Sequence, residues 1–363
     1  MPKPIFLIAG ARPNFIKIAP LIRELKKTKI KFKLIHTGQH YDYNMSKIFF
    51  NDLEIPDPDI HLNVGSASHA FQTAKIMMEF EKVILNELPR LVVVVGDVNS
   101  TLACALVAKK HNIKIAHVES GLRSFDQNMP EEINRILTDQ MSDFLFTSES
   151  SAGINLKREG IDLNKIFFVG NIMIDTLNFS LKKARELKTL EKFNLEKNQY
   201  ALITIHRPSN VDTAENLGEV IKMLNYTQEK LKIFFPIHPR TKKRLKEFNL
   251  KRQLKSNIIL SEPIGYLEFL NLMLNSKLII TDSGGIQEEA SFLKIPILTI
   301  RENTERPITI EKGTNEIVGK DFKRFKKYLN EILTSRYKQG QSIEKWDGKT
   351  AERIIEIINK KLF

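Results

Sequence analysis

The run Leu91–Val95 is apolar throughout, and short runs of this kind recur along the whole chain between segments of helical periodicity. A strand with apolar side chains on both faces is buried on both faces, which is typical of a parallel sheet covered by helices. In the first half of the chain we expect strands at residues 5–9, 32–36, 91–95, 113–118, 144–147 and 165–169, and helices at 14–27, 45–53, 70–87, 100–111 and 131–141. The sequence therefore predicts an α/β protein built on parallel sheets.

The same alternation starts again at Tyr200, and a chain of 363 residues has room for two domains. Further strands are expected at 200–205, 233–237, 258–260, 278–280 and 297–300. We therefore predict two Rossmann-like, doubly wound domains that face a central cleft, at residues 1–170 and 171–349. A polar helix is expected near the boundary at 180–192, and an amphipathic helix at 350–362 is expected to pack back on the first domain.

The chain carries a formal net charge of +13, which favours an anionic partner. Its lysines are scattered over the expected helix faces, and the densest cluster, at 242–246, lacks the interleaved aromatic side chains that stack on nucleic-acid bases. We therefore predict an anionic small substrate, and no binding of nucleic acid.

Three features bear on where the protein works. Its one cysteine, Cys104, cannot form an internal disulfide, and residues 1–4 lead straight into a strand, unlike a signal peptide. No apolar run reaches the length of a membrane span. We therefore expect a cytoplasmic protein that does not bind a membrane.

A Gly-rich turn is expected at residues 281–285, between an apolar run and a helical pattern. Its two glycines let a ligand approach the backbone, Ser283 offers a hydroxyl, and the N–H groups of a helix start bind anions. Glu288 or Glu289 would then lie where a ribose attached to that anion sits. The pattern predicts a nucleoside-diphosphate site; the alternative is an ordinary strand-to-helix turn with an aspartate cap.

Ligands of doubly wound sheets bind beyond the carboxyl ends of the strands. Polar groups follow the expected strands at 10–17, 96–101, 119–123, 129–135, 206–208 and 238–240. Among them, the carboxylates Asp97, Glu119 and Glu131 could serve as acid and base in a shielded cleft. The alternative for Asp97 and Glu119 is that they cap helices or pair with Arg12 and Arg123.

Other charged side chains suit phosphate or proton chemistry. Arg12, Lys17 and Arg306 are suitable phosphate clamps, and the alternative for each is a solvated surface charge. His206 could move a proton or bind phosphate, although a lone histidine is more often structural, and His238 is interpreted as structural. Neither the Cys and His spacing of a zinc site, a Walker lysine motif nor Gly-x-Gly-x-x-Gly is present, so we predict no metal, ATP or NAD.

Motifs at residues 10–13, 17, 36–40, 96–97, 117–123, 130–135, 170–171, 206–207, 238–239, 281–289 and 304–307 resemble those of the non-hydrolysing UDP-N-acetylglucosamine 2-epimerases, in order across essentially the whole chain. The resemblance implies the glycosyltransferase B type of fold, a homodimer, and no cofactor. It also implies reversible inversion at C2 between UDP-N-acetylglucosamine and UDP-N-acetylmannosamine, through elimination of UDP to a 2-acetamidoglucal and re-addition of UDP.

The resemblance also assigns roles by motif position. It implies that Asp97, Glu119 and Glu131 are the acid/base set and that His206 is a catalytic or phosphate-contacting group. The residues that it implies as contacts of UDP are Arg12, Lys17, Ser283, Gly284, Gly285, Glu289 and Arg306, with Phe269 near the uracil. Gln39 and His40 match part of a second, regulatory UDP-sugar site.

The chain departs from the usual family pattern at Asn14, Phe15, Tyr41, Asp42, Val98, Ser120 and Ile264. Its motifs at 10–17 and 37–42 are more similar to a subgroup that includes epimerases of UDP-2,3-diacetamido-glucuronic acid, so the sugar could carry extra groups. A glycosyltransferase of the same fold and a catalytically silent UDP-sugar sensor are further alternatives. The three carboxylates favour an epimerase over a sensor, because mere binding of an anion gains nothing from further negative charges.

Overall fold

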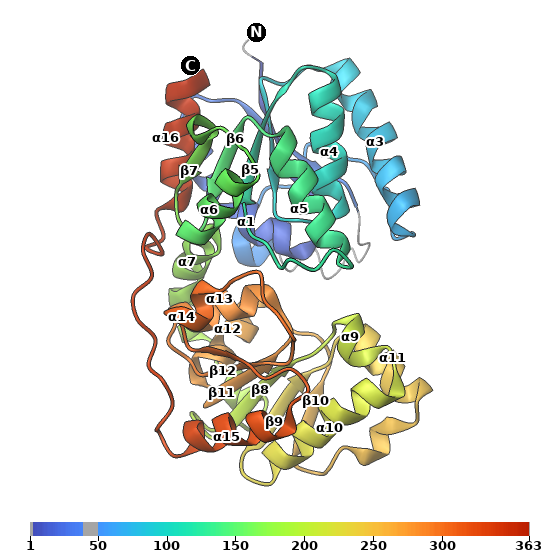
Figure 1. Cartoon of the computed structure of the whole chain (residues 1–363), viewed down its shortest axis with the longest axis vertical. Coiled ribbons are helices and arrows are strands. Elements are labelled where there is room, and N and C mark those ends of the chain that lie inside the picture. Colours follow the sequence, from blue (N-terminus) through green and yellow to red (C-terminus); the bar gives the residue numbers. More distant parts are fainter. Residues whose placement is uncertain (1–2, 39–49, 363) are drawn as a thin grey trace. The chain divides into compact units, whose positions relative to one another are not determined.

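The computed structural model describes residues 3–38 and 50–362. The chain forms two compact units, one made of Met1–Phe179 with Glu344–Phe363 and the other of Ser180–Ile343 (Figure 1). The boundary falls inside helix α7 (Ile172–Glu186), whose first turns are apolar and buried. The prediction of one helix at 180–192 was therefore wrong, because α7 starts earlier and ends at Glu186, and a separate helical turn, α8 (Thr189–Lys192), follows it.

The first unit is built on a 7-stranded parallel sheet. Its strands in spatial order are β3 (Ile60–His61), β2 (Phe32–His36), β1 (Ile5–Ala9), β4 (Leu91–Val95), β5 (Lys114–Ser120), β6 (Phe144–Thr147) and β7 (Ile166–Phe168). The order changes direction between β1 and β4, which is the kind of position where doubly wound sheets bind ligands. β3 was not expected, because a strand of two residues carries no periodic signal.

Helices follow the strands of the first unit. They are α1 (Arg12–Lys26), α3 (His69–Asn86), α4 (Asn99–Lys110), α5 (Pro130–Met141) and α6 (Ser150–Arg158), with a 3₁₀ turn at Leu163–Lys165. Residues 50–53 are helical, and the rest of the helix expected at 45–53 lies outside the described residues. The start of α1 is held by Asn14, whose Oδ1 accepts hydrogen bonds from the N–H groups of Gly10 (3.1 Å) and Ala11 (2.9 Å).

The C-terminal helix α16 (Thr350–Leu362) belongs to the first unit and packs against α1 (Figure 1). Two side chains fix the segment that leads into it. Asp175 Oδ1 accepts from the N–H of Ala351 at 2.7 Å, and Trp346 Nε1 donates to the carbonyl of Ser148 at 3.1 Å.

The second unit is built on a 6-stranded parallel sheet. Its strands in spatial order are β10 (Ile258–Ser261), β9 (Lys232–Pro236), β8 (Tyr200–Thr204), β11 (Leu278–Thr281), β12 (Ile297–Thr299) and β13 (Asn315–Ile317). Its helices are α9 (Pro208–Val211), α10 (Ala214–Gln228), α11 (Pro239–Glu247), α12 (Tyr266–Asn275), α13 (Gly284–Phe292), α14 (Ile308–Glu311) and α15 (Phe322–Leu333), with a 3₁₀ turn at Leu250–Gln253. β13 was not expected, since its first two residues are polar.

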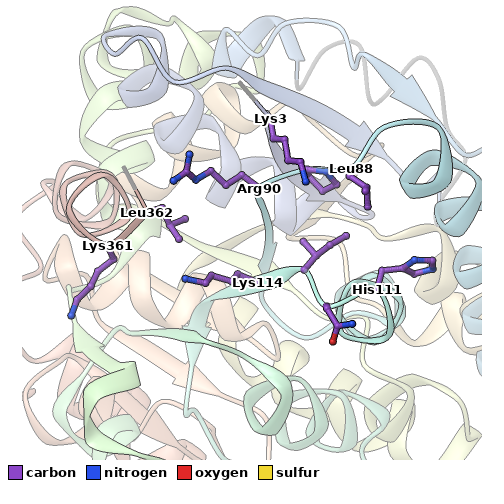
Figure 2. Close-up of a pocket in the computed structure, with 10 residues that line it drawn as sticks. Lys3, Leu88, Arg90, His111, Lys114, Lys361 and Leu362 are labelled. Carbon is purple, nitrogen blue, oxygen red and sulfur yellow. The ribbon is translucent and has the colours of Figure 1, made fainter. Parts of the chain in front are cut away.

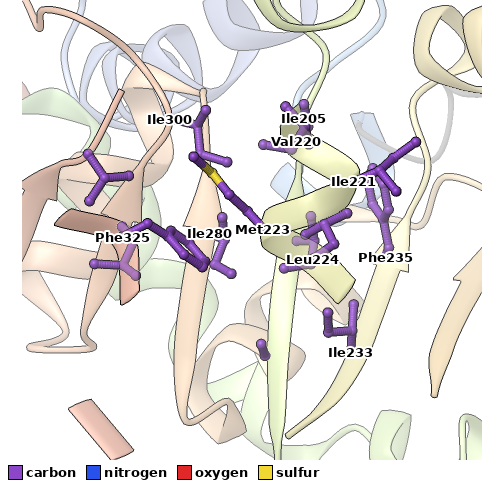
Figure 3. Close-up of a cluster of buried hydrophobic side chains, with 14 of the residues drawn as sticks. Ile205, Val220, Ile221, Met223, Leu224, Ile233, Phe235, Ile280, Ile300 and Phe325 are labelled. Atoms are coloured by element: carbon purple, nitrogen blue, oxygen red, sulfur yellow. The ribbon is translucent and has the colours of Figure 1, made fainter. Parts of the chain in front are cut away.

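Apolar side chains fill the space between each sheet and its helices. In the second unit, α10 places Met223 and Leu224 over the sheet, and Phe325 of α15 joins the same fully buried cluster (Figure 3). Each such side chain contributes about 1.5–3 kcal/mol by leaving water. Packing of this kind fixes the strand ends, and therefore the polar loops that follow them.

Within residues 3–38 and 50–362, every helix is too short or too polar to span a lipid bilayer.

Candidate active site

Glu119 has an unusual backbone conformation at the carboxyl end of β5. Its φ is +72°, and the register between β5 and β6 shifts between Val118 and Ser120. Residues other than glycine rarely adopt a positive φ, and such strain is concentrated at functional sites, where the surrounding structure holds it. The bulge turns the Glu119 side chain away from the regular alternation of the strand.

Lys17 of α1 is the partner of Glu119. Its Nζ lies 2.7 Å from each carboxylate oxygen, and both side chains are buried. Gly96 makes room for this pair, since its φ is +64° and an added Cβ would lie 2.8 Å from Lys17 Nζ. Arg123, which was one alternative partner of Glu119, pairs instead with Asp139 and Glu159.

Asp97, directly after β4, is held by Arg135 of α5. Arg135 Nη2 lies 2.7 Å from Asp97 Oδ2, and its Nε donates to the same oxygen at 3.1 Å. Arg135 is completely buried, and its Nη1 binds Glu132 at 2.5 Å. Glu132 in turn accepts the N–H groups of Ser124 and Phe125. A buried guanidinium thus orients the Asp97 carboxylate. Arg135 and Glu132 belong to the motif at 130–135, but the sequence assigned no role to either.

A second buried network supports the same strand end. His117 of β5 places Nδ1 2.6 Å from Asp139 Oδ1 and Nε2 2.8 Å from the carbonyl of Gly96, the residue before Asp97. Asp139 also accepts the Gly121 N–H and pairs with Arg123. Although burial opposes it, the interactions with His117 and Arg123 keep the pKa of Asp139 below its usual value. Asp139 gave no signal in the sequence, because nothing there links it to residues some twenty positions earlier.

Glu131 lies half-buried in the first turn of α5, where the helix dipole favours a carboxylate. Among the described residues it makes no hydrogen bond or ion pair, unlike Asp97 and Glu119. Arg12 begins α1. Its side chain, and the whole of Gln39 and His40, lie outside the described part of the structure.

The turn expected at 281–285 is present between β11 and α13, with Ser283 as the residue before the helix. Asp282 does not cap this helix. Its carboxylate instead accepts the N–H groups of His206 (3.0 Å) and Arg207 (2.8 Å) and the side chain of Asn210 (3.1 Å). The aspartate-cap alternative is therefore wrong, and the first N–H groups of α13 have no helical partner.

Arg306 lies against the start of α13. A Cβ added to Gly284 would come within 2.7 Å of Arg306 Nη1, so only glycine leaves room for the guanidinium. Glu305 and Glu288 hold Arg306 in place, at 2.5 Å from Nη1 and 2.9 Å from Nε respectively. All three charged side chains are buried. An anion at this helix start would meet both the helix dipole and a fixed guanidinium.

The structure separates the two neighbouring glutamates. Glu288 is the partner of Arg306, whereas Glu289 Oε1 accepts the hydroxyl of Tyr266 at 2.7 Å. Burial, with a contribution from Glu288, raises the pKa of Glu289 to about 7. Glu289 lies in the second turn of α13. Among the described residues it has no cationic partner of the kind that Glu288 has in Arg306.

His206 is partly exposed at the end of β8, with Nδ1 3.1 Å from Asp282 Oδ1 and its ring centroid 5.2 Å from that of His238. His238 is bonded locally, as expected, because its Nδ1 accepts the N–H of Arg240 at 3.2 Å. Phe269 of α12 is half-buried and packs on an apolar cluster of the second unit.

A hollow of about 440 Å³ occurs elsewhere, at the amino-terminal edge of the first sheet. Lys3, Arg90 and Lys114 line it from the starts of neighbouring strands, and Figure 2 shows Arg90 and Lys114 extending towards Leu362. Cations there complement the negative end of the dipole of α16. The hollow contains none of the candidate residues, so it is not part of this site.

The candidate residues therefore form two groups, one in each unit, both at carboxyl ends of parallel strands. The first unit carries paired and oriented carboxylates, which suit proton transfer. The second carries an anion-binding helix start with its arginine. The described part of the chain has no group of three or more His, Cys, Asp or Glu side chains placed to bind a metal ion.

A family model described as UDP-N-acetylglucosamine 2-epimerase matches residues 23–359. The UDP-N-acetylglucosamine 2-epimerase of Methanocaldococcus jannaschii is 50% identical over 359 residues, covering 97% of this chain and 98% of that protein. The UDP-2,3-diacetamido-2,3-dideoxy-D-glucuronate 2-epimerase of Pseudomonas aeruginosa is 42% identical over 319 residues, covering 87% and 88%.

Among solved structures, the Methanocaldococcus jannaschii UDP-GlcNAc 2-epimerase in complex with UDP-GlcNAc and UDP matches with a TM-score of 0.92 at 49% identity, covering 98% of this chain and 99% of that one. This match confirms the prediction of an α/β fold of the glycosyltransferase B type. Together with the matched family model and the order of the motifs, it shows that the chain belongs to the UDP-N-acetylglucosamine 2-epimerase family.

Proposed function

We propose that the chain is an isomerase that interconverts UDP-N-acetylglucosamine and UDP-N-acetylmannosamine by inversion at C2. The observation that carries this proposal is the pair of oriented carboxylates, Asp97 on Arg135 and Glu119 on Lys17, at neighbouring strand ends of an epimerase-family chain. The relative from Methanocaldococcus jannaschii, solved with UDP-GlcNAc and UDP, supports a UDP-sugar as the ligand.

The first step is an elimination. A carboxylate removes the proton from C2, the C1–O bond to the diphosphate breaks with its electron pair leaving on oxygen, and a C1=C2 double bond forms. The C2 proton is only weakly acidic, so this step needs a positioned base and a stabilised leaving group. Asp97, Glu119 and Glu131 are the residues proposed for proton transfer.

The second step reverses the first on the other face of the sugar. UDP adds back at C1, and a proton is delivered to C2 from the side opposite to the one it left. Two acid/base groups are therefore needed, one for each face, which agrees with more than one carboxyl group in the first unit. His206, which is bonded to Asp282, is proposed as a further proton-transferring or phosphate-contacting group.

The second unit is proposed to hold UDP between the two steps. The helix start at Ser283, Gly284 and Gly285 and the guanidinium of Arg306 suit a diphosphate that gains negative charge as it leaves. Glu289 is proposed as the partner of the ribose and Phe269 as the aromatic neighbour of the uracil. The roles of Arg12, Lys17, Gln39 and His40 towards UDP remain predictions.

Proton NMR of the purified protein with UDP-N-acetylglucosamine in heavy water tests the reaction. The expected result is deuterium at C2 together with appearance of the manno epimer. An acceptor-dependent transfer of the sugar, with no exchange at C2, would instead indicate a glycosyltransferase, and binding without any change would indicate a sensor.

A modified sugar is the second candidate substrate, favoured by the 42% identity to the Pseudomonas aeruginosa enzyme. The same experiment with UDP-2,3-diacetamido-2,3-dideoxy-D-glucuronate separates the two. Faster exchange at C2 with the diacetamido sugar than with UDP-N-acetylglucosamine would assign the chain to that substrate.

We propose in addition that the protein is a homodimer. Phe71, Met78 and Leu85 of α3 repeat every seven residues, so they lie on one face of the helix, and they are 63%, 63% and 70% exposed. An exposed apolar stripe of this kind is a common feature of protein interfaces. A cytoplasmic location remains a prediction.

A further inference from the structure

Arg301 follows β12 and is buried, although the sequence gave it no role. One of its guanidinium nitrogens, Nη2, lies 2.8 Å from Glu305 Oε2 and donates to Asn303 Oδ1 at 3.4 Å. Its other terminal nitrogen, Nη1, is also buried but has no hydrogen-bond partner among the described residues.

A buried guanidinium N–H without a partner is rare and costly, because the group has lost its water and gained nothing in return. Arg301 is linked through Glu305 to the side chains that surround the start of α13. Glu305 joins it to Arg306, and a Cβ on Gly284 would approach both Glu305 Oε1 (2.9 Å) and Arg306 Nη1 (2.7 Å). One carboxylate therefore separates Arg301 from the helix start.

Two further guanidinium groups lie near Arg301. Burial most of all, and then nearby Arg207 and Arg306, lower the pKa of Arg301, while Glu305 opposes them. Arg207 and Arg306 are therefore close enough to Arg301 to repel its charge. A diphosphate carries more than one negative charge and would be attracted by all three guanidinium groups.

We propose that Arg301 is a further diphosphate-binding residue of the second unit, whose Nη1 donates to a phosphate oxygen while Nη2 keeps Glu305 on Arg306. This inference rests on the proposed UDP-sugar function, because it names an additional contact of the same ligand. Arg306 lies at the helix start itself, and Arg301 adds a second guanidinium behind the Glu305 carboxylate.

Isothermal titration of the full chain with UDP, UMP and uridine tests the proposal. Arg301→Met should weaken binding of UDP by tenfold or more, weaken UMP less, and leave uridine unchanged, because loss of one charge-assisted hydrogen bond is felt only by the phosphates. Arg336→Met is the matched control, since Arg336 is an exposed arginine of the same unit, and it should bind all three ligands as the wild type does.

Arg301→Met leaves Glu305 without one of its cations and could therefore destabilise the fold. A second variant that keeps the charge separates loss of phosphate binding from loss of stability. Arg301→Lys keeps the charge beside Glu305 but loses the fork of the guanidinium, and it should lose UDP affinity selectively while its Tm stays near that of the wild type. If both variants bind UDP as tightly as the wild type, or if uridine weakens as much as UDP, Arg301 is not a phosphate ligand.

The two proposals fail in different ways. A protein that binds UDP through Arg301 but exchanges no deuterium at C2 would refute the epimerase and keep this assignment. An active epimerase in which Arg301→Lys and Arg301→Met both bind UDP as tightly as the wild type would refute this assignment and keep the epimerase.

Discussion

Lys17 Nζ lies 2.7 Å from both carboxylate oxygens of Glu119, and the two side chains are buried together at the end of β5. Removing one member of a buried ion pair leaves the other charge without compensation, which typically costs about 3–5 kcal/mol. We therefore expect Lys17→Met to lower the Tm and the turnover. The exposed Lys26→Met on the same helix should change neither. A double variant, Lys17→Met with Glu119→Gln, should recover much of the stability but not the activity. If Lys17→Met alone kept a wild-type Tm, the ion pair would not contribute to the stability of the fold.

Asp97→Asn tests acid/base chemistry with little change of shape. The amide can still accept from Arg135, so the fold and the affinity for UDP should be retained while the kcat falls roughly 100-fold or more. Asp57→Asn, at an exposed aspartate of the same unit, serves as the control. The measurements are the kcat from NMR and the UDP affinity from titration. A near-normal kcat would reassign Asp97 to a structural role.

Gly284→Ala tests the room beside Arg306. The φ of Gly284 is not in the left-handed region, so the backbone accepts alanine, but the new Cβ would overlap Arg306 Nη1. We expect a clear loss of UDP affinity. Gly218→Ala is the contrasting control, because nothing lies within 4 Å of its Cβ position in α10, and there alanine should stabilise the fold by about 0.5–1 kcal/mol. Unchanged UDP affinity in Gly284→Ala would place the anion elsewhere.

The pKa of Glu289, raised to about 7 mainly by burial, makes stability depend on pH. Between about pH 4.5 and 7 the unfolded carboxyl loses its proton while the folded one keeps it, so the native state binds more protons. The free energy of unfolding should therefore fall as pH rises through this window, by at most about 1.4 kcal/mol per pH unit from this one group. It should not change further above the folded pKa.

Glu289→Gln removes this contribution and keeps an acceptor for Tyr266. In urea unfolding, the free energy of unfolding of this variant should be close to that of the wild type at pH 4.5 and should exceed it towards pH 7. Glu215→Gln, at an exposed glutamate, is the control and should follow the wild type at every pH. Parallel pH curves for wild type and Glu289→Gln would show that Glu289 is already ionised in the folded protein.

The apolar stripe of α3 predicts the effect of charge on assembly. Met78→Glu should shift the mass in sedimentation from dimer to monomer, because burying an unpaired carboxylate in the interface is costly. Leu163→Glu, at another exposed leucine of the first unit, should leave the mass unchanged. A monomeric wild type, or a Met78→Glu variant that still dimerises, would remove α3 from the interface.

The sequence alone determined the class of fold and the position of the polar groups at the ends of the strands. Apolar runs such as Leu91–Val95 fix buried parallel strands, because burial on both faces leaves no room for alternation. A Gly-rich joint such as 284–285 likewise marks a helix start, since its chemistry is local. These patterns span a few residues, so they can be recognised without knowledge of the fold.

Tertiary structure decided which charges meet. Glu119 pairs with Lys17, 102 residues away, and this pairing depends on how α1 packs against β1 and β4. The positive φ of Glu119, the hold of Arg135 on Asp97 and the buried Arg301 are likewise set by packing between distant segments. Local sequence patterns do not indicate such long-range pairs. The electrostatic interactions that favour these pairs become strong only when the sheets have formed and water has been excluded.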